Sequence, residues 1–227
     1  LLIYLPNLKK ETMTLDLLNS YERELAPLFE RYKHYEFINQ QRVLNAFQEH
    51  RVGEHHLHGT HGYGHDDIGR ETLEKIFAQV MGAEAALVRP HIASGTHAIT
   101  AALFGMLRPN DELLFITGHP YDTLEEEVGV RGENNMGSLK DWGVHYREVD
   151  VRDYDDAPSC PWDAWLKPET RVVMIQRSRG YSWRSSLFIE QIEALIKEVK
   201  SRRPDIYVFV DNCYGEFVED KEPCAVG

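Results

Sequence analysis

The stretch Glu112-Leu113-Leu114-Phe115-Ile116-Thr117 holds four consecutive apolar residues, and comparable runs occupy 172–175 and 206–210. These runs are continuous rather than alternating, which is typical of strands buried on both faces. Shorter or weaker patterns predict further strands over 85–88 and 144–151. Since helical patterns separate the runs, the sequence predicts an α/β fold with a mostly parallel sheet that helices cover on both faces.

Helical periodicity marks the segments between the runs. Apolar residues at helical spacing predict helices over 96–107 and 187–200. A third helix is expected to begin after Asp66 or Asp67, either of which can cap it, and to end at Gly82. Helices therefore alternate with strands along most of the chain.

The first part of the chain has a different character. Residues 15–52 follow a helical pattern, in which Pro27 marks a kink or a boundary. We therefore expect a helical N-terminal arm over 1–52 and a large domain over 53–227.

Composition limits the class of protein. The chain has 227 residues, of which 42% are apolar and 27% charged, as in ordinary globular proteins. The formal charge is −12, which argues against a general nucleic-acid binder because an acidic surface repels phosphates. No apolar stretch is long enough to span a membrane. Three cysteines without metal-binding spacing favour a reducing compartment, the cytoplasm.

Loops that follow parallel strands are the usual place for ligands. Ser94-Gly95-Thr96 enters a helix, so it either cradles a phosphate or simply caps the helix. Tyr121 follows a strand, where its ring either stacks on a ligand or packs within the loop. Asp211 ends the last strand, where an ionised carboxylate needs a cation or donors, unless it makes an Asx-turn or a helix cap.

The order of these three features is informative. A pyridoxal phosphate site needs a cup for the phosphate, a platform for the ring and a carboxylate that keeps the ring nitrogen protonated. The protonated ring then stabilises a carbanion at the substrate Cα.

Five long motifs make the interpretation specific. The chain resembles the methionine gamma-lyase-related family, also called the aluminium-resistance protein family, among the fold-type-I pyridoxal-phosphate enzymes. The motifs occupy residues 61–70, 87–98, 118–124, 176–181 and 210–217.

The resemblance assigns roles to individual residues. It implies that Ser94, Gly95 and Thr96 bind the cofactor phosphate. It further implies that Tyr121 stacks on the pyridine ring and that Asp211 pairs with the ring nitrogen, which makes these two the candidate catalytic residues.

Other positions concern the subunit interface and anion binding. Tyr63 resembles the tyrosine that related lyases lend to the neighbouring subunit's phosphate, although His65 stands where those lyases carry an arginine. The resemblance also implies a homodimer or homotetramer. Arg177 and Arg179 are candidates for binding a substrate or cofactor anion, with surface or interface ion pairing as the alternative.

The family lysine that forms the Schiff base lies well beyond the strand-end aspartate. Here Gly227 ends the sequence 16 residues after Asp211, and Lys221 stands earlier, in an acidic loop. We therefore expect the large domain to be truncated before that lysine and before the small C-terminal domain. We also expect the chain to be inactive alone, since transaldimination needs the lysine amine.

The resemblance implies a carbon–sulfur lyase that acts on a sulfur-containing amino acid. It would form an external aldimine, remove the Cα proton through a quinonoid, and eliminate at the β or γ position. One alternative is a metal-binding hydrolase, although glycines interrupt its ligand spacing, and no metal is predicted. The other is a non-catalytic, truncated interaction protein. The candidate metal ligands are His55, His56, His58, His61, His65, Asp66 and Asp67.

Overall fold

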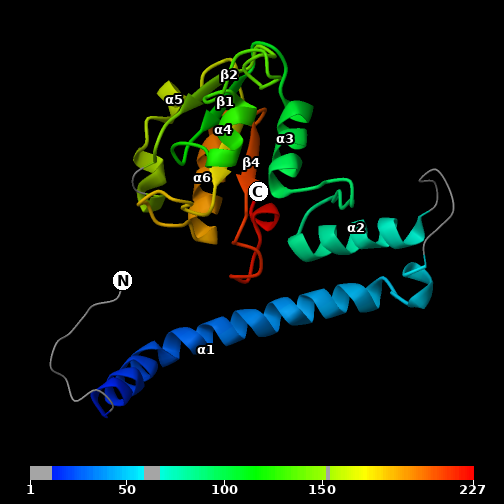
Figure 1. The fold of residues 1–227 in the computed structure, drawn as a ribbon, viewed down its shortest axis with the longest axis vertical. Helices are drawn as coiled ribbons and strands as arrows, with labels where there is room; N and C mark the ends of the chain where they lie inside the picture. Colours follow the sequence, from blue (N-terminus) through cyan, green and yellow to red (C-terminus); the bar gives the residue numbers. More distant parts are fainter. Residues whose placement is uncertain (1–11, 59–66, 152–153) are drawn as a thin grey trace.

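The computed structural model describes residues 12–58, 67–151 and 154–227. Helices come first along the chain, and from β1 onward strands and helices alternate (Figure 1). They are α1 (Thr12–Glu49), η1 (Glu54–His56), α2 (Ile68–Met81), α3 (Gly95–Met106), β1 (Glu112–Phe115), α4 (Asp122–Val128), β2 (His145–Glu148), η2 (Tyr154–Ser159), α5 (Trp162–Trp165), β3 (Thr170–Gln176), α6 (Ile189–Arg202), β4 (Tyr207–Asp211) and η3 (Pro223–Ala225).

The four strands form one sheet in the order β2-β1-β3-β4, and every neighbouring pair is parallel. The predicted α/β class with a parallel sheet is therefore confirmed. Strands β2 and β3 lie on opposite sides of β1, so the strand order changes direction between β1 and β3. At such a switch point the loops diverge and leave room for a ligand.

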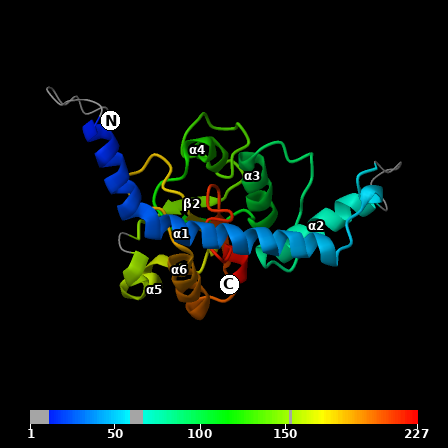
Figure 2. The same ribbon diagram turned by 90° about the horizontal axis from the view of Figure 1, so that it is seen from below.

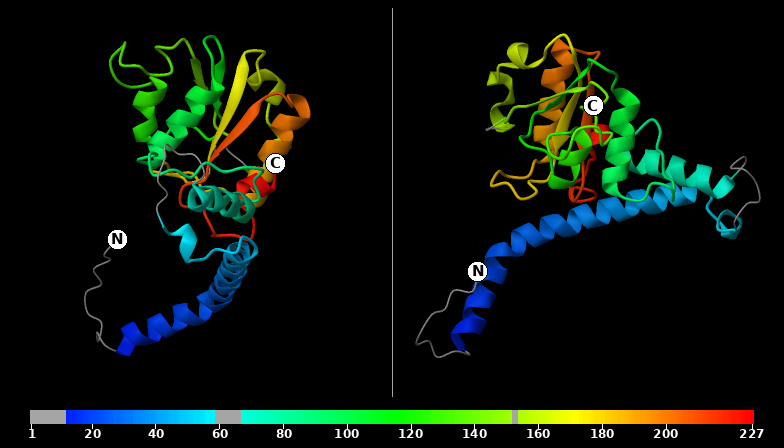
Figure 3. Two further views of the ribbon diagram at one scale, coloured as in Figure 1. Left: turned by 90° about the vertical axis from the view of Figure 1, so that its right-hand side faces the viewer. Right: turned by 45° about the horizontal axis from the view of Figure 1, so that its top comes forward.

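Helices cover both faces of the sheet, as Figure 3 shows. Leu113 and Phe115 of β1 point to the face covered by α3 and α4, where they pack in one buried cluster. Leu114 of β1 and the following Ile116 point to the other face, where they pack with residues of α5 and α6. Successive strand residues alternate between faces, so a continuous apolar run supplies both clusters. Burial of each such side chain contributes about 1.5–3 kcal/mol.

Helix α1 is a single element of 38 residues that includes Pro27, so the proline is not a boundary. The helix runs along the underside of the body, and its N-terminal part extends away from it (Figures 1 and 2). Near its C-terminal end, Ala46 packs with Ile76 and Val80 of α2 in a small buried cluster. The helical arm is thus observed, whereas the domain boundary at residue 52 stays a prediction.

The strand predicted over 85–88 is wrong. This segment has no regular secondary structure, and the side chain of Leu87 is exposed. The N–H of Val88 donates to Glu74 Oε1 of α2 (3.0 Å) instead of to a strand. A short apolar run becomes a strand only where a neighbouring strand offers hydrogen bonds, and none lies beside this one in the described part of the chain.

The predicted ends of α2 are confirmed. Asp67 caps the helix by accepting from the N–H of Arg70 (3.0 Å), and Gly82 ends it in the left-handed region with φ 69°. The alternative cap, Asp66, lies outside the described residues. Over the described residues, no helix is both long and apolar enough to cross a membrane.

Candidate functional site

The N-terminus of α3 carries the predicted phosphate cradle. Ser94 caps the helix, because its Oγ accepts from the N–H of His97 (3.0 Å). The capping interpretation of Ser94 is therefore confirmed, and it does not exclude the other one. Within the described residues, the N–H groups of Gly95 and Thr96 have no hydrogen-bond partner. Apart from the neighbouring residues and the backbone of α3 itself, no described atom lies within 4 Å of the position that a Cβ would take at Gly95, so the backbone here is open to an anion.

A hydroxyl pair joins this cradle to the loop after β1. Thr96 Oγ1 lies 2.9 Å from Thr123 Oγ1, in the first turn of α4. Tyr121 precedes that turn directly and occupies the N-cap position of α4. The structure therefore brings the predicted cradle and the predicted stacking tyrosine together.

Tyr121 is half-buried and held through its main chain. Its N–H donates to Gln176 Oε1 at the end of β3 (3.1 Å). Its ring stacks on that of Tyr181, with ring centroids 5.9 Å apart and an angle of 20° between the planes. The hydrogen bond with Tyr181 raises the pKa of the Tyr121 hydroxyl, and the charges of Tyr181 and Asp122 act in the same direction. The hydroxyl is therefore neutral at physiological pH.

Asp211 ends β4 and is half-buried. Burial raises the pKa of its carboxyl, and the charge of Glu216 adds to this effect, while the N–H of Cys213 opposes it. That N–H donates to Asp211 Oδ1 (3.1 Å), which is the Asx-turn considered from the sequence. No ion pair joins Asp211 to a cationic side chain in the described ranges. A carboxyl in this state would be stabilised by a positive group.

Gln176 connects Asp211 with Tyr121. Gln176 pairs in register with Asp211 across β3 and β4, and its side chain binds the main chain of Tyr121. Tyr214, three residues after Asp211, also lies close enough to affect the pKa of Tyr121. Sequence reasoning missed Gln176. The signals that could have found it are its position as the first polar residue after the apolar run of β3 and its place at the start of the motif 176–181.

A pocket of about 500 Å³ opens between the loops that follow β1 and β3. Tyr121, Gln176 and Tyr181 line it, together with the exposed Arg179. The candidate cradle and Asp211 are not among its lining residues. The pocket therefore adjoins the three predicted features rather than enclosing them.

Arg177 is not available to bind an anion, which was one of the two roles considered from the sequence. Its side chain is buried, and its Nη1 donates to Asn212 Oδ1 (2.8 Å) and to the carbonyl of Gly215 (2.9 Å). It also pairs with Glu219. Because its donors are used within the fold, the alternative of ion pairing holds for Arg177, although its partner Glu219 is half-buried rather than at the surface. Arg179 remains a candidate.

The structure describes only part of the histidine-rich loop over residues 55–67. Tyr63, His61 and His65 lie outside the described residues, so the predicted role of Tyr63 stays a prediction. His56 Nδ1 accepts from the N–H of Gly53 (3.1 Å), as part of a local turn. Within the described ranges, no group of three histidine, cysteine, aspartate or glutamate side chains could hold a metal ion.

Comparison with known proteins identifies the family. The family model described as "Methionine gamma-lyase" matches residues 14–227. The chain therefore belongs to the methionine gamma-lyase family. The resemblance drawn from the five motifs is thus confirmed.

Members of this family are similar over almost the whole chain. The Bacillus subtilis protein YnbB is 51% identical over 211 residues, which are 91% of this chain and 49% of that protein. A Listeria innocua structure, named as a candidate cystathionine beta-lyase involved in aluminium resistance, is 48% identical with a TM-score of 0.88. It covers 96% of this chain and 53% of its own.

A third relative carries a more general name. The Clostridium novyi structure, named a carbon-sulfur lyase involved in aluminium resistance, is 41% identical with a TM-score of 0.85. It covers 96% of this chain and 52% of its own. This chain therefore spans about half the length of the relatives it matches.

Proposed function

We propose that this protein acts as a pyridoxal-phosphate-dependent carbon–sulfur lyase on a sulfur-containing amino acid. The observation that carries the proposal is Asp211. It is a half-buried carboxyl with a raised pKa and no cationic partner in the described ranges, at the carboxyl edge of a parallel sheet. The names of the Listeria and Clostridium relatives agree with this class of reaction.

The residues present fit the cofactor. The open N–H groups of Gly95 and Thr96 suit its phosphate, because a helix N-terminus favours a dianion. The ring of Tyr121 offers an aromatic platform, and Asp211 offers a partner for a protonated ring nitrogen. Bound there, the cofactor supplies an electron sink for a carbanion at the substrate Cα.

The side chains of this chain then have defined tasks. Asp211 would hold a proton on the ring nitrogen of the bound cofactor, because the positive nitrogen would keep its carboxyl ionised. Tyr121 would shield one face of the cofactor ring from water. Arg179, exposed at the pocket, offers a guanidinium to a substrate carboxylate.

We further propose that the protein is a cytoplasmic homodimer or homotetramer. Helix α1 supports self-association, because its N-terminal part carries exposed apolar residues at helical spacing. These residues are Leu18, Tyr21, Leu25, Phe29 and Tyr32. In this arrangement Tyr63 would contribute to the neighbouring subunit's phosphate site.

The substitution Asp211→Asn in the full-length protein tests the role of the carboxyl. We expect turnover of cystathionine or methionine, measured as keto acid and thiol release, to fall by orders of magnitude. The reason is that an amide no longer holds a proton on the ring nitrogen. The control Asp205→Asn removes an exposed carboxylate that pairs with Arg203 just before β4, and should leave turnover unchanged. Near-normal activity of the Asp211 variant would contradict the proposal.

A further inference from the structure

Gln176 occupies the centre of the carboxyl edge. It is the last residue of β3, which lies between β1 and β4, and its side chain is buried. Its N–H donates to Thr117 Oγ1 just after β1 (3.0 Å), and it pairs in register with Asp211 on β4. The residue therefore contacts both neighbouring strand ends through its main chain.

The amide of Gln176 adds a second set of connections. Oε1 accepts the N–H of Tyr121 (3.1 Å), and Nε2 donates to the carbonyl of Ser178 (3.1 Å). A buried amide is stable only where its donors and acceptors are satisfied, so these bonds fix the side chain in one orientation. Through this amide, the loop after β1 is tied to the loop after β3.

Gly180, in the loop after β3, packs closely against the side chains of Gln176 and Tyr121. Gly180 has φ 55°, and a Cβ there would lie 3.3 Å from Gln176 Nε2 and 3.5 Å from Cδ2 of the Tyr121 ring. The loop after β3 thus turns directly over the amide and the ring. Only a residue without a side chain adopts this backbone conformation without strain.

Tyr121 is therefore held at two points. Gln176 binds its N–H, and the Thr96–Thr123 hydroxyl pair fixes the turn that follows it. We propose that Gln176 is a positioning residue. Its side-chain amide fixes the main chain of Tyr121, and thereby the position of the Tyr121 ring relative to Asp211. This inference rests on the proposed function only where it concerns the cofactor. The hold on Tyr121 itself follows from the geometry.

Two substitutions in the full-length protein separate the two ends of the amide. Gln176→Met keeps an unbranched side chain of similar length but removes both hydrogen bonds. Gln176→Glu keeps an acceptor for the N–H of Tyr121 and loses the donor to Ser178. Amide hydrogen exchange, read at Tyr121 and across residues 178–184, and binding of pyridoxal phosphate, read by absorbance and circular dichroism, are the measurements.

In Gln176→Met we expect exchange at the Tyr121 amide to speed up at least tenfold. The affinity for pyridoxal phosphate should fall about tenfold, which corresponds to the loss of roughly one hydrogen bond. In Gln176→Glu we expect Tyr121 to stay protected and the cofactor signal to persist, while residues 178–184 exchange faster. Rescue by the acceptor alone is a result that a merely structural role would not produce.

Thr117→Val is the matched control, because it removes the buried hydrogen bond of the Gln176 main-chain N–H and leaves the side-chain amide unchanged. It should lower the melting temperature while leaving the cofactor affinity unchanged. Wild-type exchange at Tyr121 in Gln176→Met, or faster exchange at Tyr121 in Gln176→Glu, would overturn the inference. If the unaltered protein bound no pyridoxal phosphate, the proposed function would fail, and the Tyr121 amide would still decide the role of Gln176.

Discussion

The acidic residues Glu112 and Asp211, at opposite ends of the sheet, have different roles. At the amino end, Glu112 is buried and accepts from Arg147 Nε and Nη2 (2.8 and 2.7 Å) and from Thr170 Oγ1 (2.6 Å). At the carboxyl end, Asp211 has a single backbone donor and no cationic partner among the described side chains. A fully satisfied acid stabilises the fold, whereas an unsatisfied one points to a ligand.

Glu112 predicts a pH dependence of stability. Burial acts to raise the pKa of Glu112, but the hydrogen bonds from Arg147 and Thr170 outweigh it and lower the pKa below the ordinary value of 4.5. Because the folded pKa is the lower one, this stability is present above pH 4.5 and is lost as the pH falls through the folded pKa. Glu112→Gln should lower the free energy of unfolding at pH 7 by about 1–3 kcal/mol, measured in urea.

The same variant should flatten the fall in stability below pH 4.5, because the titrating group is gone. Glu30→Gln is the control, since Glu30 forms an exposed pair with Lys33. Its effect should stay within about 0.5 kcal/mol. Equal acid sensitivity in the Glu112 variant and the wild type would contradict the prediction.

Arg177 gives a second prediction at this scale. Arg177→Met removes the cationic partner of Glu219 and the donor to Asn212 Oδ1 and to the carbonyl of Gly215, while Glu219 keeps the N–H of Ile189. We expect the free energy of unfolding to fall by about 3–5 kcal/mol, as for other broken buried pairs. Arg179→Met changes an exposed neighbour of the same type and should leave stability unchanged. Similar unfolding curves for both variants would show that Arg177 is not structural.

Among the elements, α3 joins a stability role to a proposed binding role. Ser94→Ala removes the cap of the helix and should lower the free energy of unfolding by about 1 kcal/mol. It should also weaken binding of pyridoxal phosphate, because the first turn frays. Ser201→Ala is the control, since Ser201 lies near the C-terminal end of α6 and donates to the carbonyl of Glu198. Urea unfolding and cofactor titration of both variants check this, and equal effects would refute it.

The sequence predicted the elements that a buried strand defines. The apolar runs of β1, β3 and β4 were sufficient to predict a parallel sheet, and with it the loops that hold Tyr121 and Asp211. The run over 85–88 was misassigned, because a strand also needs a neighbour, and pattern alone does not supply one. The helix ends at Asp67 and Gly82 were predictable because capping is a local interaction.

The parts that escaped prediction depend on contacts distant in sequence. Nothing in the order of residues shows that Gln176 binds the N–H of Tyr121, 55 positions earlier. Nor does it show that Arg177 is enclosed by the segment after β4 rather than free to bind an anion. Both outcomes follow from strand register, which a single sequence leaves open.

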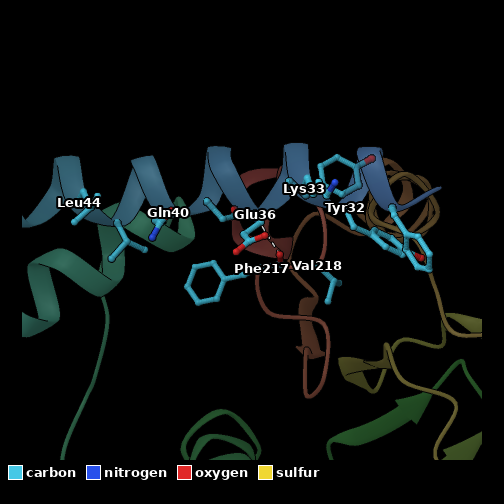
Figure 4. A pocket seen from close by; sticks show the side chains of 11 residues that line it. Tyr32, Lys33, Glu36, Gln40, Leu44, Phe217 and Val218 are labelled. Carbon is cyan, nitrogen blue, oxygen red and sulfur yellow. Dashed lines mark hydrogen bonds between the residues drawn. The ribbon is translucent and has the colours of Figure 1, made fainter. Parts of the chain in front are cut away.

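In the whole molecule, the long helix α1 has little cover, because most of its described side chains are exposed. A hollow of about 1050 Å³ lies between α1 and the segment after β4, where Phe217 and Val218 face the helix (Figure 4). Toward its N-terminal end, the apolar residues of α1 are exposed. A helix of this kind is not stable in water unless another surface covers its apolar face.

Leu25→Glu tests whether that surface belongs to a second copy of the protein. A charge within the exposed apolar stripe should dissociate the oligomer, which gel filtration with light scattering would show as a smaller mass. Glu24→Lys alters the charge of a neighbouring exposed residue that is not in the stripe, and should leave the mass unchanged. A wild-type mass for Leu25→Glu would argue against self-association through α1.

The two edge strands of the sheet, β2 and β4, differ in their protection against pairing with another strand. Strand β2 is short and ends at the exposed Glu148, whose charge discourages further pairing. Strand β4 presents Tyr207-Val208-Phe209-Val210 with no strand on its outer side in the described chain. Such an open ladder of N–H and carbonyl groups is a template for another strand. Expressed by itself at high concentration, this polypeptide should therefore tend toward fibrous or amorphous precipitation, nucleated at β4.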